Sequence, residues 1–337
     1  MKLNMREWTK SYMENPVKKP MPILSFPGCQ MIGHTVEELT KSGELQAQCM
    51  KAIADRFDTG AAFSLMDLSV EAEAFGSTVV FSSDDVPTIT GALVKDENDA
   101  EALKVPEIGV GRTDECIKGI RKACELIADR PVFAGMIGPY SLAGRLLDMT
   151  EIMILCYEDP DMVETVLEKA TQFLISYAKS FKEAGANGIA MAEPAAGILS
   201  PGLMDEFSNP YVKRIREAVE DDEFIVLYHN CGNIEFLLKN IRDIEAEVYS
   251  VGNAIDMEKA LEVLPEDKMI LGNIDPAGTI RNGTPEQVKK ETMNLLEKCG
   301  EYKNFVLSSG CDIPPMSPLE NIQAFFDAAS EYYASIK

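Results

Sequence analysis

Three side chains stand out because their chemistry and spacing would let them share one metal ion. His229 and Cys231 are two residues apart, and Cys311 lies in a distant Ser-Gly-Cys-Asp segment. Alternate residues at the end of a strand point the same way, so an imidazole nitrogen and a thiolate could face one ion. Three protein ligands with a fourth position open are typical of catalytic zinc, which accepts both ligand types readily. The pattern predicts a catalytic zinc site, although a core histidine and two buried thiols would show the same spacing.

Five other residues, each just past a predicted strand, are candidates for the rest of the site. Glu193 and Asp256 are candidate catalytic carboxylates that could fill the open metal position when no substrate is bound. The alternative for each is an ordinary loop carboxylate. Tyr140, Asn273 and Asp275 are candidate cofactor-binding residues. The tyrosine could line the cavity, whereas the other two could instead hold loop backbone or support residues that contact the ligand.

Eight short apolar runs alternate with longer amphipathic ones, and this order predicts the fold. Continuous apolar runs of this length are typical of strands buried on both faces of a parallel sheet. Eight such strands alternating with helices favour a (β/α)8 TIM barrel, an α/β fold, over an open doubly wound sheet. The predicted strands are residues 22–26, 61–66, 132–137, 188–192, 224–228, 248–251, 269–272 and 305–307.

Such a barrel would bring the three predicted ligands together. In this fold the chemistry lies in the loops that follow the strands, at their carboxyl ends. His229 and Cys231 follow the fifth predicted strand, and Cys311 follows the eighth. We therefore expect the three side chains to converge at the barrel mouth. Their sulfur atoms should lie within roughly 5 Å of each other, as a tetrahedral site with zinc–sulfur bonds of about 2.3 Å requires.

Helical patterns fill most of the chain between the strands, and no linker divides it. We expect one domain over residues 1–337, with residues 1–20 as an N-terminal extension. We expect residues 67–112 to form an insertion after the second strand, with a hairpin beside the barrel mouth. Ser or Thr followed by Pro, at residues 200, 284 and 317, predicts three helix starts. The main predicted helices are residues 114–129, 161–184, 201–219, 285–299 and 318–336.

The composition limits the partners of the protein. The 32 Lys and Arg against 55 Asp and Glu give a net charge of −23. This acidity argues against nucleic acid or an anionic membrane as a partner, because phosphate binding needs clustered cations. No apolar run approaches the roughly 20 residues that span a bilayer, and the N-terminus lacks a secretory signal. The eight scattered cysteines indicate reduced thiols and a cytoplasmic protein.

Several motifs resemble the uroporphyrinogen decarboxylase superfamily, and within it the zinc-dependent methyltransferases that demethylate corrinoid proteins. Gly-Pro-Tyr-Ser-Leu-Ala-Gly at 138–144 is similar to the segment after the third strand of the family. Gly-Asn-Ile-Asp-Pro at 272–276 is similar to its Gly-Asn-Leu-Asp-Pro motif, and Gly-Cys-Asp-Ile-Pro at 310–314 to the methyltransferase ending. His229-x-Cys231 with Cys311 looks like the zinc signature, the most specific of these motifs.

One segment departs from the decarboxylases of this superfamily. Decarboxylases carry arginines after the first strand that receive the propionates of a porphyrinogen, whereas residues 25–31 here contain no arginine. Porphyrinogen decarboxylation is therefore disfavoured, because eight carboxylates would meet an acidic protein without these cations. A metal-free decarboxylase or lyase is the alternative. A scaffold or corrinoid-binding relative without activity is a third possibility, against which the intact ligand set argues.

The resemblance implies methyl transfer from a methylated corrinoid to a thiol such as coenzyme M. A free thiol is mostly protonated at neutral pH, and zinc binding would deprotonate it. Two cysteine thiolates and a neutral His229 would cancel the zinc charge, which leaves a bound substrate sulfur electron-rich. No Asp-x-His-x-x-Gly segment marks a cobalamin-binding domain, so we expect a partner protein to supply the methyl-corrinoid. The acceptor could be coenzyme M, homocysteine, another small thiol or tetrahydrofolate.

Overall fold

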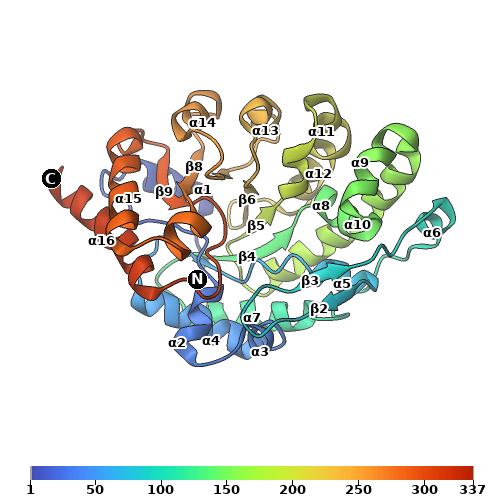
Figure 1. The fold of residues 1–337 in the computed structure, drawn as a ribbon, viewed down its shortest axis with the longest axis horizontal. Helices are drawn as coiled ribbons and strands as arrows, with labels where there is room; N and C mark the ends of the chain where they lie inside the picture. The colour runs from blue at the N-terminus through green and yellow to red at the C-terminus, as the bar shows by residue number, and fades with distance from the viewer. Residues whose placement is uncertain (1, 337) are drawn as a thin grey trace.

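Seven parallel strands form one curved sheet whose order follows the chain. A computed structural model describes residues 2–336. Helices surround the sheet on its outer side (Figure 1). The α/β barrel class predicted from the sequence is confirmed. The strands, in order across the sheet, are β1 (Ala62–Phe63), β4 (Val132–Ile137), β5 (Gly188–Ala192), β6 (Ile225–Asn230), β7 (Val248–Val251), β8 (Met269–Ile274) and β9 (Phe305–Ser309).

The helices between the strands agree closely with the predicted amphipathic segments. None of the helices within residues 2–336 is long and apolar enough to cross a membrane. The α-helices are α1 (Met5–Glu14), α2 (Cys29–Ile32), α3 (Val36–Thr40), α4 (Gly43–Arg56), α5 (Val70–Phe75), α6 (Glu97–Ala102), α7 (Thr113–Leu126), α8 (Pro139–Leu147), α9 (Met149–Glu158), α10 (Pro160–Glu183), α11 (Pro201–Phe207), α12 (Asn209–Val219), α13 (Leu238–Arg242), α14 (Met257–Val263), α15 (Pro285–Cys299) and α16 (Leu319–Ser335). Shorter helical turns are η1 (Phe26–Gly28), η2 (Pro194–Ile198), η3 (Glu235–Leu237) and the π-helix η4 (Pro276–Arg281).

The first predicted strand, residues 22–26, is not a strand. The preceding residues lie extended between β9 and β1, where Met21 N donates to Leu307 O and Gly60 N donates to Pro20 O, both at 2.9 Å. The ladder cannot continue because Pro22 has no N–H, and Ile23 N donates instead to the Ser309 hydroxyl at 3.1 Å. Residues 20–24 therefore complete the barrel wall, as its first position before β1, without regular strand pairing.

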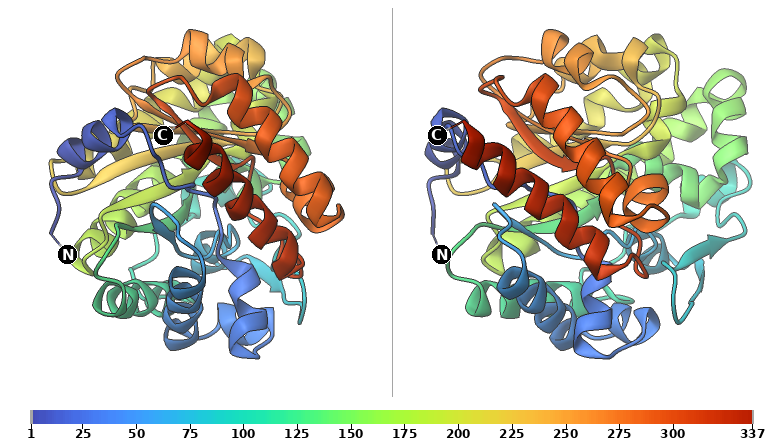
Figure 2. Two further views of the ribbon diagram at one scale, coloured as in Figure 1. Left: turned by 90° about the vertical axis from the view of Figure 1, so that its left-hand side faces the viewer. Right: turned by 60° about the vertical axis from the view of Figure 1, so that its left-hand side comes forward.

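Alternation along the strands separates the barrel interior from the helix-facing side. Ile225 and Leu227 of β6 belong to an inner apolar cluster, whereas Val226 and Tyr228 belong to the cluster under the helices. Helix α1 packs against this inner cluster, with Met5 fully buried. Figure 2 shows α1 at one end of the barrel and the β2–β3 hairpin at the other. The N-terminal helix therefore covers the end opposite the mouth.

The insertion after β1 contains the predicted hairpin, formed by the antiparallel strands β2 (Thr78–Val80) and β3 (Thr88–Thr90). Its two ends are joined by Arg112, which forms a buried ion pair with Asp67. The same guanidinium donates to Glu73 at 2.6 Å and to the Ser69 hydroxyl at 2.7 Å. One side chain thus fastens the end of the insertion to its beginning beside the mouth.

Two predicted helix starts or spans need correction. The predicted helix 201–219 is two helices, α11 and α12, which meet at Ser208. Pro210 explains the break, because it lacks the N–H that a continuous helix would bond to the fourth residue back. Ser200 and Thr284 cap their helices as predicted. Ser317 does not cap α16, whose N-cap position is Pro318.

Candidate metal centre at the barrel mouth

The structure brings the three predicted ligands together. One ligand atom each from His229, Cys231 and Cys311 can be chosen so that all lie within 4.8 Å of one another. His229 ends the inner face of β6, Cys231 follows in the next loop and Cys311 comes two residues after β9. The imidazole is buried, whereas both cysteines are half-buried. Within residues 2–336 no carboxylate belongs to this group.

The hydrogen bonding of His229 fits a metal ligand. Its Nδ1 lies 3.0 Å from the hydroxyl oxygen of Ser250, which is on the inner face of β7. Its Nε2 is buried and has no hydrogen-bond partner. A buried polar atom without a partner is costly, and a metal ion would relieve that cost. A ligating histidine usually makes a hydrogen bond through its other ring nitrogen, which fixes the tautomer and ring orientation. Together with two thiols, this donor set fits zinc.

Two glycines allow the ligand loops to approach each other. A Cβ atom at Gly252, just after β7, would lie 2.6 Å from the Cα atom of Cys231. A Cβ atom at Gly310, directly before Cys311, would lie 2.6 Å from the backbone nitrogen of Asn253. Both contacts are with backbone atoms, so a side-chain movement could not relieve them. The lack of a side chain at these positions lets the loops after β6, β7 and β9 pack around the site.

The two cysteines titrate as a pair. A hydrogen bond from the Cys311 thiol lowers the pKa of Cys231 well below that of an ordinary thiol, against the effect of burial. The same hydrogen bond, together with burial, raises the pKa of Cys311. The pair therefore readily holds one negative charge on Cys231. A cation bound between the sulfurs would favour loss of the second proton, because metal ligands must be deprotonated.

The two candidate carboxylates have other partners in the structure. Glu193 is fully buried, and its carboxylate accepts from Tyr140 N at 3.0 Å and Ser141 N at 2.6 Å, at the start of α8. Burial raises the pKa of Glu193 to about 7. Asp256 is exposed and caps α14 by accepting from Glu258 N at 3.1 Å. In the structure each carboxylate accepts hydrogen bonds from the start of a helix, and neither lies within the cluster of His229, Cys231 and Cys311.

The three candidate cofactor-binding residues divide into two groups. Tyr140 is fully buried, with its hydroxyl against Met153 and Cys156, so it does not line the mouth as its sequence position suggested. Asn273 donates to Gly252 O and Ile255 O, both at 2.9 Å, and so holds the loop after β7. Asp275 caps η4. The latter two also line a polar cavity of about 400 Å³ beside β8, so they remain accessible to a ligand.

Comparison with known proteins places the chain in a family. Residues 17–332 match the family model of uroporphyrinogen decarboxylase (URO-D). The chain belongs to the uroporphyrinogen decarboxylase family. This confirms the resemblance seen in the sequence motifs.

Relatives within the family have different activities. Methylcobamide:CoM methyltransferase MtbA of Methanosarcina acetivorans is 27% identical over 97% of this chain and 99% of that protein. A uroporphyrinogen decarboxylase of Anaeromyxobacter dehalogenans is 28% identical over 88% of this chain and 87% of that protein. The solved structure of a methyltransferase from Methanosarcina mazei superposes with a TM-score of 0.86, with 28% identity over 99% of both chains. Overall identity does not separate the two activities, so the site residues must.

A further carboxyl group, that of Glu71, is buried against the end of β4. Glu71 Oε1 accepts from Ile137 N at the end of β4 at 3.1 Å, whereas Oε2 is buried without a partner. Burial raises the pKa of Glu71 to about 7, and the neighbouring charge of Asp67 adds to this effect. The signal for this residue in the sequence was weak, because Glu71 lies in a short helix of the insertion rather than directly after a strand.

Replacing Glu71 with glutamine is expected to remove a pH-dependent cost of folding. Because the pKa in the folded protein is about 7 and the ordinary value is 4.5, the folded state holds more protons between these values. Wild-type stability therefore falls as pH rises from 4.5 towards 7. The unfolding free energy of Glu71→Gln minus that of wild type should therefore increase by about 2–3 kcal/mol as the pH rises from 5 to 8. Urea unfolding of both proteins across this range measures the difference, and a constant difference would contradict the expectation.

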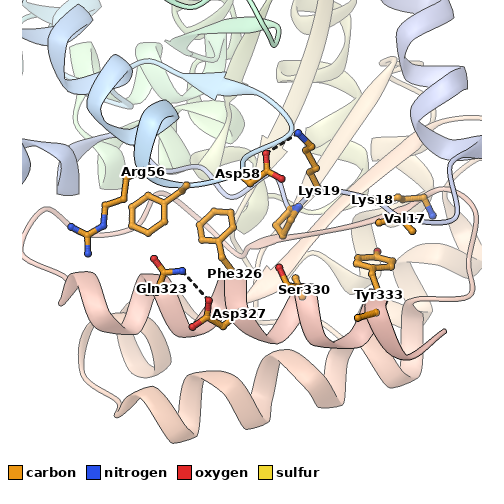
Figure 3. A pocket seen from close by; sticks show the side chains of 14 residues that line it. Val17, Lys18, Lys19, Arg56, Asp58, Gln323, Phe326, Asp327, Ser330 and Tyr333 are labelled. Atoms are coloured by element: carbon orange, nitrogen blue, oxygen red, sulfur yellow. Dashed lines mark hydrogen bonds and ion pairs between the residues drawn. The ribbon is translucent and has the colours of Figure 1, made fainter. Parts of the chain in front are cut away.

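A second cavity, of about 420 Å³, lies at the other end of the barrel (Figure 3). It is bounded by α16, including Phe326 and Tyr333, and by residues 17–20 and 56–58. Residues 17–20 lead into the extended wall segment 20–24, and residues 56–58 come shortly before β1. The cavity therefore lies near the amino ends of the strands. It is therefore separate from the site of His229.

Proposed function

We propose that the protein is a zinc-dependent methyltransferase that moves a methyl group from a methylated corrinoid protein to a small thiol. The observation that carries this proposal is the buried, unpartnered Nε2 of His229 beside the thiols of Cys231 and Cys311. The names of relatives such as methylcobamide:CoM methyltransferase MtbA support the same reaction. Coenzyme M is accordingly the first acceptor to test.

The residues of the chain prepare the site for a thiol. His229 and the two cysteines would hold zinc, which when bound would keep a coordinated substrate thiol deprotonated at neutral pH. Ser250 fixes the orientation of the imidazole through Nδ1. Both cysteines are half-buried rather than enclosed, which leaves access from the mouth. In the overall reaction a sulfur–carbon bond forms, the cobalt–carbon bond breaks with its electron pair left on cobalt, and the thiol proton goes to solvent.

The rim of the mouth fits a protein partner that delivers the corrinoid. Ile198 follows β5, Phe236 follows β6 and Met316 follows β9, and all three are large apolar side chains about half exposed. Exposed apolar residues that surround one opening are typical of a protein contact. The two free thiols that the site requires fit a reducing compartment, and we infer a cytoplasmic location.

The metal-free decarboxylase is the second candidate function, and the segment after the first wall position argues against it. Residues 25–31 contain no arginine. In the structure this segment forms η1 and the start of α2, and the amide of Gln30 donates to Pro315 O and Ser317 O. It therefore presents no guanidinium groups to the propionates of a porphyrinogen.

The proposal predicts which of two reactions the purified protein performs. Incubated with methylcobalamin and 2-mercaptoethanesulfonate, it should form the methylated thiol, and removal of zinc with a chelator should abolish this activity until zinc is restored. Incubated with uroporphyrinogen, it should form no coproporphyrinogen. Mass spectrometry of the thiol and fluorescence of the oxidised porphyrins measure the two products. Decarboxylation without methyl transfer would replace the proposed function with the second candidate.

A further inference from the structure

The order of the wall segments shows what faces the metal ligands across the mouth. Residues 20–24 take the first position, followed by β1, β4, β5, β6, β7, β8 and β9. The ligands come from the fifth position, β6, and the eighth, β9. The midpoint of the opposite arc therefore falls between β1 and β4. Residues that follow these two strands are the ones that a substrate spanning the mouth would meet.

Glu71, on this opposite wall, lies at the same height along the barrel axis as His229. Ile137 is paired in register with Ala192, and Ala192 with His229. Because Glu71 accepts from Ile137 N, its carboxyl group sits at the level of His229. Helix α5 carries Glu71, and α8, which follows β4, packs against α5.

Arg145 of α8 is a half-buried cation on this wall. Glu71 and Asp67 are the charged groups that influence its pKa, and burial, the larger effect, lowers it. Yet among residues 2–336 no hydrogen bond or ion pair joins the Arg145 guanidinium to another group. None of the Arg145 guanidinium nitrogens is both buried and without a partner. Because the guanidinium has no protein partner among the described residues, its nitrogens are exposed to solvent. Asp67 is already paired with Arg112. A guanidinium offers five N–H donors in a fixed fork that matches acidic groups.

We propose that Arg145 determines acceptor specificity by receiving an acidic group, a sulfonate or a carboxylate, at the far end of the thiol substrate. This inference rests on the proposed function. The thiol sulfur would lie beside Cys231 and Cys311, and its acidic group would extend across the mouth to the wall between β1 and β4. A charge-assisted hydrogen bond to this guanidinium gives the acidic thiol an advantage over an uncharged thiol of similar size. Arg145 makes no hydrogen bond or ion pair within residues 2–336, so its donors are free to bind such a group.

The test compares thiols that differ in the acidic group, by calorimetric binding to the zinc-loaded protein and by steady-state methyl transfer. Wild type should bind 2-mercaptoethanesulfonate more tightly than 2-mercaptoethanol. Arg145→Gln should weaken binding of the sulfonate about 10- to 100-fold and raise its KM similarly, with kcat little changed. Binding of 2-mercaptoethanol should not change. Arg145→Lys, which keeps the charge, should recover part of the loss.

The matched control is Arg121→Gln, which removes the same charge from an exposed position on α7. It should leave all constants as in wild type. Including 3-mercaptopropionate and homocysteine identifies the acid, because the preferred thiol should suffer the largest loss in Arg145→Gln. Equal weakening of acidic and uncharged thiols, or no weakening, would overturn the role of Arg145. Failure of methyl transfer with a retained binding preference would instead remove the proposed function and leave Arg145 as the acid-binding residue.

Discussion

Replacing Cys311 with serine is expected to remove most of the bound zinc and to lower the rate of methyl transfer by at least about 100-fold. The wild-type protein should carry about one zinc per chain, because three ligand atoms converge at one point. A serine hydroxyl is a poor substitute for a thiolate, so the site would keep only His229 and Cys231. Metal analysis of both purified proteins, together with product formation from methylcobalamin and thiol, measures the two effects.

The control for this substitution is Cys124→Ser. Cys124 is also half-buried, but it lies on α7 and is not part of the group that could bind a metal. The Cys124→Ser protein should keep the zinc content and the methyl-transfer rate of wild type. Equal zinc content in wild type and Cys311→Ser would show that the metal is elsewhere. Loss of zinc without loss of activity would separate the metal site from the reaction.

The sequence predicted that His229, Cys231 and Cys311 would lie close together, because their positions depend on a simple periodicity. Two-residue alternation along β6 carries Ile225, Leu227 and then His229 to the inner face, and the barrel order brings β9 to the same mouth. The partner of His229 was less predictable. Ser250 occupies the inner face of β7 by the same alternation, but no motif distinguishes it from other serines in the chain. Only the pairing of His229 with Ser250 across the β6–β7 register reveals its role.

Two of the candidate site residues have partners that the sequence did not indicate, because these contacts are distant in sequence. Glu193 follows β5 as an active-site carboxylate would, yet its oxygens bind the first turn of α8, more than 50 residues earlier. Tyr140 lies in that turn, and its direction depends on the packing of α9. A position after a barrel strand therefore indicates the mouth, but it does not say whether a side chain faces the cavity or a neighbouring loop. The strand predicted at residues 22–26 does not form for a local reason, because Pro22 has no N–H to donate.

Replacing Arg112 with alanine is expected to destabilise the protein by about 3–5 kcal/mol, because it leaves the buried carboxylate of Asp67 without its counter-charge. Asp67 and Arg112 are both buried, and the same guanidinium also binds Ser69 and Glu73. The loss should concentrate at the insertion, since Arg112 joins its two ends. Denaturant unfolding gives the global effect. Hydrogen exchange should show faster opening of residues 67–112 than of the barrel strands.

Arg214→Ala is the matched control, because Arg214 also makes a two-point ion pair, with Glu168, but on an exposed surface. Exposed pairs contribute at most about 1 kcal/mol, since water screens the charges and both side chains lose freedom. The difference between the two alanine variants therefore reports burial rather than the number of ion pairs. A cost for Arg112→Ala no larger than that for Arg214→Ala would mean that Asp67 and Glu73 find water or protons in place of the guanidinium. Arg112 would then not be what fastens the insertion beside the mouth.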